Sequence, residues 1–250
     1  MKALIVANWK MNPPTFREAK ALFEETKRMT GLTKGISVVV APPAIFLRGL
    51  TGGQRKGRVA FGVQNAHFET AGSHTGEISM AQARNAKATY VIVGHAERRA
   101  MGELNGDTQK KVAAALTAQM TPILCIGEKT REANADHFNV VREQLRTALL
   151  DISENKLSKI IIAYEPVWAI GASAAIKPRD MHEMSIFIRK TIVEKFGEVG
   201  HSIRILYGGS IDATNAGDML RNGEVKGLLV GRASANIKTM TELLRAVNEA

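Results

Sequence analysis

A glutamate stands where an apolar run of the chain ends abruptly. Residues Ile160–Tyr164 are apolar, and Glu165 follows them directly, with Pro166 and Trp168 and then a segment of small residues at 171–175. Taken alone, a carboxylate at a strand end is more often a solvated turn residue than a catalytic group. A carboxylate from which water is excluded can act as a general base near neutral pH. The interpretation of Glu165 therefore depends on which residues stand at the ends of the other apolar runs.

Three further groups that could take part in chemistry also follow apolar runs directly. Asn8 and Lys10 are two residues apart, and because side chains alternate along an extended segment, both are expected to face the same way. His95 can serve as an acid or as an electrophile. Glycines surround Ser210, and Gly231 ends another run; glycine lets backbone N–H groups approach an anion closely. Each group alone is readily explained as a loop residue or a tight turn. It is their joint occurrence at the ends of apolar runs that indicates an active site.

Eight short apolar runs are predicted to be the strands that position these groups. They lie at Ala3–Val6, Ile36–Ala41, Val59–Val63, Tyr90–Val93, Pro122–Ile126, Lys159–Tyr164, Ile203–Leu206 and Gly227–Val230. Helices are expected between them, at Thr15–Arg28, Thr108–Ala118, Ala135–Leu149, Pro178–Phe196 and from Thr239 onward. Because the runs are apolar throughout rather than alternating, both faces of each strand are expected to be buried, as in a parallel sheet. The pattern predicts an α/β fold, a closed (β/α)₈ barrel that forms a single domain over residues 1–250.

The alternative fold is an open, doubly wound sheet. No G-x-G-x-x-G follows a strand and no G-x-x-x-x-G-K-[ST] occurs, so the nucleotide-binding signatures of such sheets are missing. In a closed barrel the active site is built from the C-terminal strand ends, which would bring Glu165, His95, Lys10 and Ser210 to one rim. A base, a polarising group, a cation and an anion cradle together suit proton abstraction next to a carbonyl in a small phosphorylated substrate.

Composition limits the other classes of function. The chain has 250 residues and one cysteine, Cys125, which excludes a disulfide framework and fits a reducing compartment. The first apolar run, Ala3–Ala7, is too short for a signal peptide or a membrane span, so a soluble, cytoplasmic protein is expected. The net charge is +10, but the basic residues are dispersed and only 5% of residues are aromatic, which argues against nucleic-acid binding. No His, Cys, Asp and Glu cluster has metal-ligand spacing, so no metal is expected.

Seven stretches resemble the triosephosphate isomerase family, and they span essentially the whole chain. They are Ala7–Asn12, Thr75–Glu77, Val93–Arg99, Leu124–Glu128, Ala163–Gly171, Tyr207–Ser210 and Leu229–Gly231. The resemblance implies a TIM barrel that interconverts dihydroxyacetone phosphate and D-glyceraldehyde 3-phosphate through an enediol or enediolate. It also implies a role in glycolysis and gluconeogenesis, with no cofactor.

The resemblance implies a role for each residue that matches the family's motifs. Glu165 would be the base that moves a proton between two substrate carbons, and His95 would polarise the carbonyl as a neutral imidazole. Lys10 would supply positive charge, and Asn8 would orient a substrate oxygen. Glu97 would not contact the substrate; it would either hold Lys10 in place or relay to His95.

The same resemblance implies a phosphate site, a lid and a partner. Gly171, Ser210, Gly231 and Arg232 would bind the substrate phosphate through their backbone N–H groups. The segment from Pro166 to about Lys177 would close over the substrate. The loop Asn65–Ser79, with Thr75 near its tip, would insert beside Asn8 and Lys10 of a second subunit, so a homodimer is expected and neither nucleic acid nor membrane is.

The sequence departs from the family's usual pattern at three places. Ala96 stands where a serine is usual, and Arg232 stands where the family has a second glycine, so a guanidinium there could aid anion binding or restrict the substrate. The lid reads Ala172-Ser173-Ala174 in place of Thr-Gly-Lys. We expect this lid to close less completely, with slower turnover and more leakage to methylglyoxal.

Two alternative functions remain open on the sequence. The first is the same chemistry on a related sugar phosphate, such as a four-carbon ketose phosphate, which Arg232 and the altered lid keep open. The second is a barrel that binds a phosphorylated ligand without catalysis, and the intact set Asn8, Lys10, His95 and Glu165 argues against it.

Overall fold

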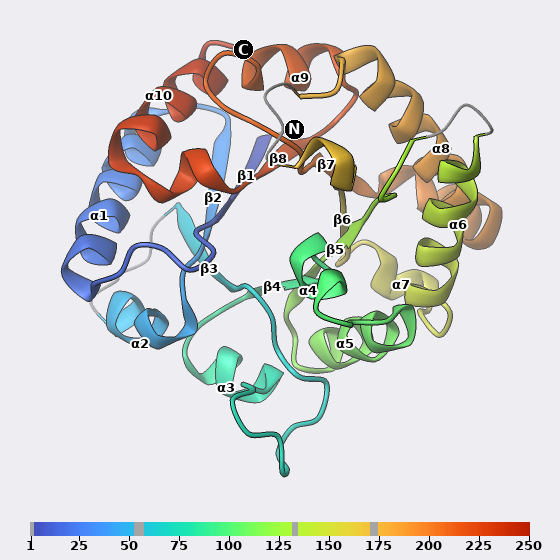
Figure 1. Ribbon diagram of the computed structural model, residues 1–250, viewed down its shortest axis with the longest axis horizontal. Coiled ribbons are helices and arrows are strands. Elements are labelled where there is room, and N and C mark those ends of the chain that lie inside the picture. Colours follow the sequence, from blue (N-terminus) through green and yellow to red (C-terminus); the bar gives the residue numbers. More distant parts are fainter. Residues whose placement is uncertain (1–2, 53–57, 132–134, 171–174) are drawn as a thin grey trace.

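The computed structural model describes residues 3–52, 58–131, 135–170 and 175–250, and its strands close into a parallel barrel (Figure 1). The strands are β1 (Ala3–Asn8), β2 (Ile36–Ala41), β3 (Val59–Val63), β4 (Tyr90–Val93), β5 (Thr121–Ile126), β6 (Ile161–Tyr164), β7 (Arg204–Tyr207) and β8 (Gly227–Val230). Each strand pairs with the next along the chain, and β8 pairs with β1. The predicted closed (β/α)₈ barrel is confirmed, and the open sheet is wrong.

Helices surround the barrel on its outside (Figure 1). The α-helices are α1 (Phe16–Leu32), α2 (Ala44–Gly52), α3 (Met80–Asn85), α4 (Ala96–Ala100), α5 (Asn105–Thr117), α6 (Asp136–Ala148), α7 (Glu154–Leu157), α8 (Pro178–Phe196), α9 (Ala216–Asn222) and α10 (Ile237–Asn248). Short 3₁₀ turns lie at η1 (Val167–Ala169), η2 (Gly197–Ser202) and η3 (Arg232–Ala235).

The sequence predicts the long helices but not the short ones. Helices α2, α3, α4 and α9 have five to nine residues, too few turns for a helical period to be recognised. Helix α3 does carry a start signal, because Ser79 and Gln82 form a reciprocal capping box. Helix α5 begins before the predicted Thr108, since its polar first turn, 105–107, lacks the apolar residues that mark a buried face.

Alternate residues of each strand face the barrel interior and the surrounding helices. On β1, Leu4 and Val6 belong to the apolar cluster inside the barrel, whereas Ile5 and Ala7 belong to the larger cluster that includes the helices. All four side chains are at most 1% exposed. The predicted burial of both strand faces is therefore confirmed, and it holds the strand ends in fixed positions.

The loop between β3 and α3 extends away from the barrel as a narrow projection (Figure 1). Its two ends are joined, because the His67 N–H donates to the Ile78 carbonyl at 2.7 Å. Within it the imidazole rings of His67 and His74 stack with centroids 4.0 Å apart, and His74 contacts the Glu69 carboxylate at 3.0 Å. The loop that the sequence marks at Asn65–Ser79 therefore has a defined internal structure of its own.

Candidate active site

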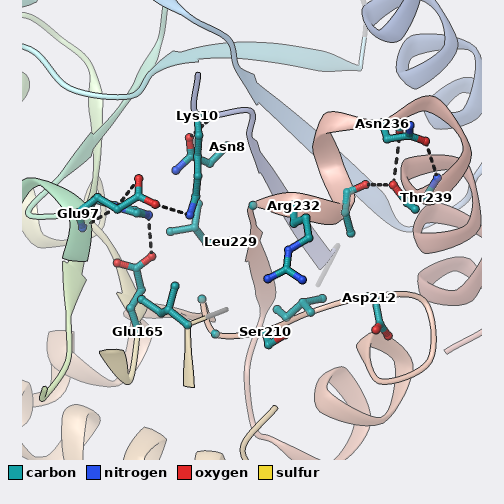
Figure 2. A pocket seen from close by; sticks show the side chains of 17 residues that line it. Asn8, Lys10, Glu97, Glu165, Ser210, Asp212, Leu229, Arg232, Asn236 and Thr239 are labelled. Atoms are coloured by element: carbon teal, nitrogen blue, oxygen red, sulfur yellow. Dashed lines mark hydrogen bonds and ion pairs between the residues drawn. The ribbon is translucent and has the colours of Figure 1, made fainter. Parts of the chain in front are cut away.

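A cavity of about 620 Å³ opens at the C-terminal ends of the strands. Most of the residues that the sequence singles out line it, and Figure 2 shows several of their side chains directed into it. They are Asn8, Lys10, His95, Glu97, Glu165, Ser210, Gly231 and Arg232. Gly171 and the altered lid residues Ala172–Ala174 lie outside the residues that the structure describes.

Asn8 and Lys10 both reach the cavity, but not because the segment is extended. Strand β1 ends at Asn8, and Lys10 has a φ of +53°, in the left-handed region. The Lys10 N–H donates to Asn8 Oδ1 at 3.1 Å, and Gln64 Nε2 donates to the Lys10 carbonyl at 2.8 Å. A non-glycine residue in this region costs about 1 kcal/mol, so these contacts hold a strained turn. Trp9, between Asn8 and Lys10, is fully buried in the core.

The Lys10 ammonium is paired with a carboxylate in the cavity. Its Nζ lies 2.6 Å from Glu97 Oε1. A Cβ added at Gly231 would lie 3.1 Å from Lys10 Cε, closer than most such contacts. Gly231 therefore leaves the room that the Lys10 side chain occupies. Glu97 holds Lys10, one of the two arrangements that the sequence suggests.

His95 is oriented by the backbone of the helix that it starts. It caps α4, and its Nδ1 accepts a hydrogen bond from the Glu97 N–H at 3.1 Å. A ring nitrogen that accepts a hydrogen bond from a backbone N–H carries no proton. We therefore assign the neutral tautomer, with the proton on Nε2, which points into the cavity. The Glu97 carboxylate is 3.8 Å from Nδ1 and does not replace this contact.

Glu165 lies beside His95, buried under the cavity floor. It is 3% exposed, and its Oε1 is 3.3 Å from His95 Nε2. Its Oε2 accepts the Ala96 N–H at 3.3 Å, so a main-chain donor holds the carboxylate where the family's serine hydroxyl is missing. A Cβ at Gly208 would lie 2.6 Å from Glu165 Cγ, and a Cβ at Gly127 would collide with the Glu165 carbonyl. Gly208 therefore leaves room for the Glu165 side chain, and Gly127 leaves room for its main chain.

A second buried carboxylate, which sequence reasoning passed over, lies behind Glu165. Glu128 is 1% exposed and accepts hydrogen bonds from the Tyr164 hydroxyl and from Trp168 Nε1, each at 2.9 Å. Burial and the adjacent Glu128 carboxylate raise the pKa of Tyr164, so its hydroxyl stays a donor. Trp168 thus anchors the segment after β6 to Glu128, and Ile170 lines the cavity.

The other side of the cavity is formed by residues that follow β7 and β8, and Figure 2 shows Ser210, Asp212 and Arg232 across from Glu97. Ser210 lines it, and the Ser210 carbonyl accepts a hydrogen bond from Asn215 Nδ2 at 3.2 Å. Asp212, which the sequence does not single out, also lines it, and hydrogen bonds from Thr214 lower the pKa of the Asp212 carboxyl. This end therefore carries an ionised carboxylate as well as the glycine-rich turns.

A tyrosine joins this end of the cavity to the segment that follows the undescribed residues. The buried hydroxyl of Tyr207 accepts the Ile176 N–H at 3.2 Å. Burial raises the pKa of Tyr207 to about 12, so the hydroxyl is neutral at physiological pH. A Cβ at Gly209 would collide with that hydroxyl, so the glycine leaves room for this contact.

Comparison with known proteins finds similarity over nearly the whole chain. A family model described as "Triosephosphate isomerase" matches residues 3–247. A triosephosphate isomerase of Endomicrobium trichonymphae is 38% identical over 247 residues, which covers 98% of each chain. One of Lawsonia intracellularis (strain PHE/MN1-00) is 37% identical over 249 residues, again with 98% of each chain covered.

Proposed function

The chain belongs to the triosephosphate isomerase family and interconverts dihydroxyacetone phosphate and D-glyceraldehyde 3-phosphate, and from that premise we propose which residues perform the reaction. Glu165 takes a proton from the carbon next to the substrate carbonyl and returns it to the neighbouring carbon. His95 gives its Nε2 proton to the carbonyl oxygen and takes up the proton of the neighbouring hydroxyl, so a proton moves between the two oxygens through the enediol(ate) as another moves between the two carbons. The observation that supports these roles best is the separation of 3.3 Å between Glu165 Oε1 and the protonated His95 Nε2.

Lys10 offsets the negative charge that develops on the enediolate oxygens. Its Nζ is already fixed by Glu97 at 2.6 Å, so little reorganisation is needed during the reaction. Asn8 is 5% exposed and keeps its carboxamide at the cavity wall, where it can orient a substrate oxygen. One proton moves from carbon to carbon and one from oxygen to oxygen, so the reaction needs no external reductant or oxidant.

The substrate phosphate binds at the far end of the cavity. We propose that backbone N–H groups of Ser210, Gly231 and Arg232, together with Gly171, hold it there. The segment from Pro166 to Lys177 closes over it, anchored by the hydrogen bonds of Trp168 and Ile176. Closure excludes water and disfavours loss of phosphate from the enediolate.

The homodimer through the Asn65–Ser79 loop and the cytoplasmic location are also proposals. The loop projects from the barrel as an interdigitating arm would (Figure 1). The single, buried Cys125 supports a reducing compartment. In the described ranges no helix combines the length and the apolar character needed to cross a membrane. We expect neither nucleic acid nor membrane as a partner.

A coupled assay with D-glyceraldehyde 3-phosphate tests the proposed roles. Glu165→Gln should lower kcat by about 10²- to 10⁴-fold, the usual worth of a general base, and should still bind inorganic phosphate. Glu154→Gln, an exposed glutamate on α7, is the matched control and should match wild type. A wild-type chain that binds phosphate yet does not isomerise the triose would contradict the proposal.

A related four-carbon ketose phosphate is a second candidate substrate. The observation that favours this substrate is the exposed guanidinium of Arg232 in the cavity wall. An added charged side chain there changes which sugar phosphates the site can bind. The ratio of kcat/KM for the two substrates decides between them, and we expect the triose phosphate to have the higher value.

A further inference from the structure

Arg232 places a charged side chain in the middle of the cavity. It follows Gly231 and begins η3, and it is exposed to solvent. Figure 2 shows its guanidinium between two groups of side chains: Lys10, Glu97 and Glu165 on one side, and Asp212 on the other. A ligand that spans the cavity from Glu165 toward Ser210 therefore passes close to this guanidinium.

The guanidinium has no ionic partner in the part of the chain that the structure describes. Lys10, the other cation of the cavity wall, is paired with Glu97 at 2.6 Å. For Arg232 no carboxylate oxygen of a described residue lies within the 4.0 Å of an ion pair. An arginine has five N–H donors arranged for two-point contact with phosphate or carboxylate. Those of Arg232 are available to a ligand.

The charges around the cavity make this cation favourable for binding an anionic ligand. Among the described lining residues, the carboxylates of Glu97, Glu165 and Asp212 face the two cations Lys10 and Arg232. Hydrogen bonds from Thr214 lower the pKa of Asp212, which keeps it ionised at neutral pH. Without Arg232 a phosphate dianion would therefore enter a cavity with a clear excess of negative charge, and like charges repel at this range.

We propose that the Arg232 guanidinium binds the substrate phosphate directly, as a side-chain ligand beside the backbone N–H donors. The proposal rests on the proposed function, because it concerns the same site. Arg232 then sets specificity: it favours substrates with a doubly charged phosphate over analogues that carry one charge or none. Charge-assisted, two-point contacts are stronger than neutral hydrogen bonds.

The test compares Arg232→Gln, Arg232→Lys and Arg221→Gln with the wild-type protein. Arg221 is an exposed arginine in the last turn of α9 that does not line the cavity, so its variant controls for the loss of net charge. The probes are inorganic phosphate and 2-phosphoglycolate, with Kd measured by calorimetry at two salt concentrations. Arg232→Gln should weaken both by about tenfold to a hundredfold, as expected for lost hydrogen bonds to a charged group. Arg232→Lys should recover part of the affinity, and Arg221→Gln should bind as wild type does.

Kinetics provide a second readout. In Arg232→Gln, kcat/KM for D-glyceraldehyde 3-phosphate should fall mainly through a higher KM, while slow turnover of unphosphorylated glyceraldehyde should not change. Unchanged phosphate affinity in Arg232→Gln would overturn the inference. So would a gain of activity on four-carbon substrates without loss of phosphate affinity, since Arg232 would then only restrict substrate size. A wild-type chain that binds phosphate through Arg232 but does not isomerise the triose would refute the proposed function and leave this inference standing.

Discussion

At the scale of single residues, the site depends on main-chain donors as much as on side chains. The Glu97 N–H fixes the tautomer of His95, and the Ala96 N–H holds the Glu165 carboxylate. Both donors belong to the first turn of α4. The short helix that His95 caps therefore aligns His95 and Glu165, the proposed acid and base, with respect to each other.

Replacing the imidazole should slow the chemistry without loosening the substrate. We expect His95→Gln to lower kcat by about 10²- to 10⁴-fold, because the amide cannot donate the proton that the carbonyl oxygen needs. KM should change little. Steady-state kinetics measure both, and His201→Gln, on the exposed turn η2, is the control. A large rise in KM with normal kcat would make His95 a binding residue instead.

At the scale of elements, the segments around the site are joined by a few buried polar contacts. Tyr207 at the end of β7 accepts the Ile176 N–H just before α8. Lys111 on α5 contacts Glu103 at 2.7 Å and Asn65 at 2.8 Å, and Glu103 in turn accepts the Gly94 N–H at 2.9 Å. Through these contacts α5 and the projecting loop are tied to the residue that precedes His95.

If the segment from Pro166 to Lys177 closes over the substrate as proposed, removing the Tyr207 hydroxyl should impair that closure. In Tyr207→Phe the buried Ile176 N–H loses its acceptor, which costs about 1–3 kcal/mol. We expect a lower kcat/KM and more methylglyoxal per isomerisation event, both measurable in one assay mixture. Tyr90→Phe, at the start of β4, is the control. Equal product ratios in Tyr207→Phe and wild type would show that this contact does not serve the lid.

The buried ion pair should matter far more for stability than an exposed one. The Lys111 and Glu103 side chains are only 6% and 3% exposed, and removing one partner of a buried pair costs about 3–5 kcal/mol. Lys111→Met should therefore lower the free energy of unfolding in urea by about that amount. Lys27→Met, which breaks an exposed pair with Glu24, should change it by less than about 1 kcal/mol. Similar losses in the two variants would contradict this reasoning.

The strands and the principal site residues could be predicted from local sequence patterns. Contacts between distant segments could not be predicted in this way. Asn8, His95 and Glu165 each follow an apolar run, so their place at the rim could be read from the sequence. The bond of Gln64 to the Lys10 carbonyl joins residues 54 positions apart, and no local pattern reveals it. The same holds for Glu128, whose burial depends on its meeting Tyr164 and Trp168 in the folded chain.

At the scale of the whole molecule, several large apolar side chains remain exposed on the single chain. Met11 is 92% exposed and Ile45 84% exposed. Burying a large apolar side chain against a second copy of the chain would be favourable. Met11 directly follows Lys10, which agrees with the proposal that the Asn65–Ser79 loop of a second copy packs beside the active site.

A charge at the tip of the loop should separate the subunits. Thr75 is exposed on the single chain, and Thr75→Arg would place a guanidinium inside the proposed contact, where burying an unpaired charge is costly. Sedimentation at micromolar concentration should show a dimer for wild type and a monomer for Thr75→Arg, with lower activity in the variant. Ser158→Arg, at another exposed position, should remain dimeric. A monomeric wild-type chain would refute the dimer.

Two glycines, Gly127 and Gly208, leave the space that Glu165 occupies, because neither carries a Cβ. At Gly127 the atom that an added Cβ would meet is the Glu165 main-chain carbonyl, and at Gly208 it is the root of the Glu165 side chain. No change of rotamer relieves the collision at Gly127, because the backbone alone fixes the positions of both the added Cβ and the Glu165 carbonyl. For protein engineering, the shape of the cavity beside Glu165 is therefore fixed, whereas its shape on the other side can be changed by substituting side chains. A barrel redesigned for a new substrate can gain or lose room at Arg232 and Asp212, but not beside the base.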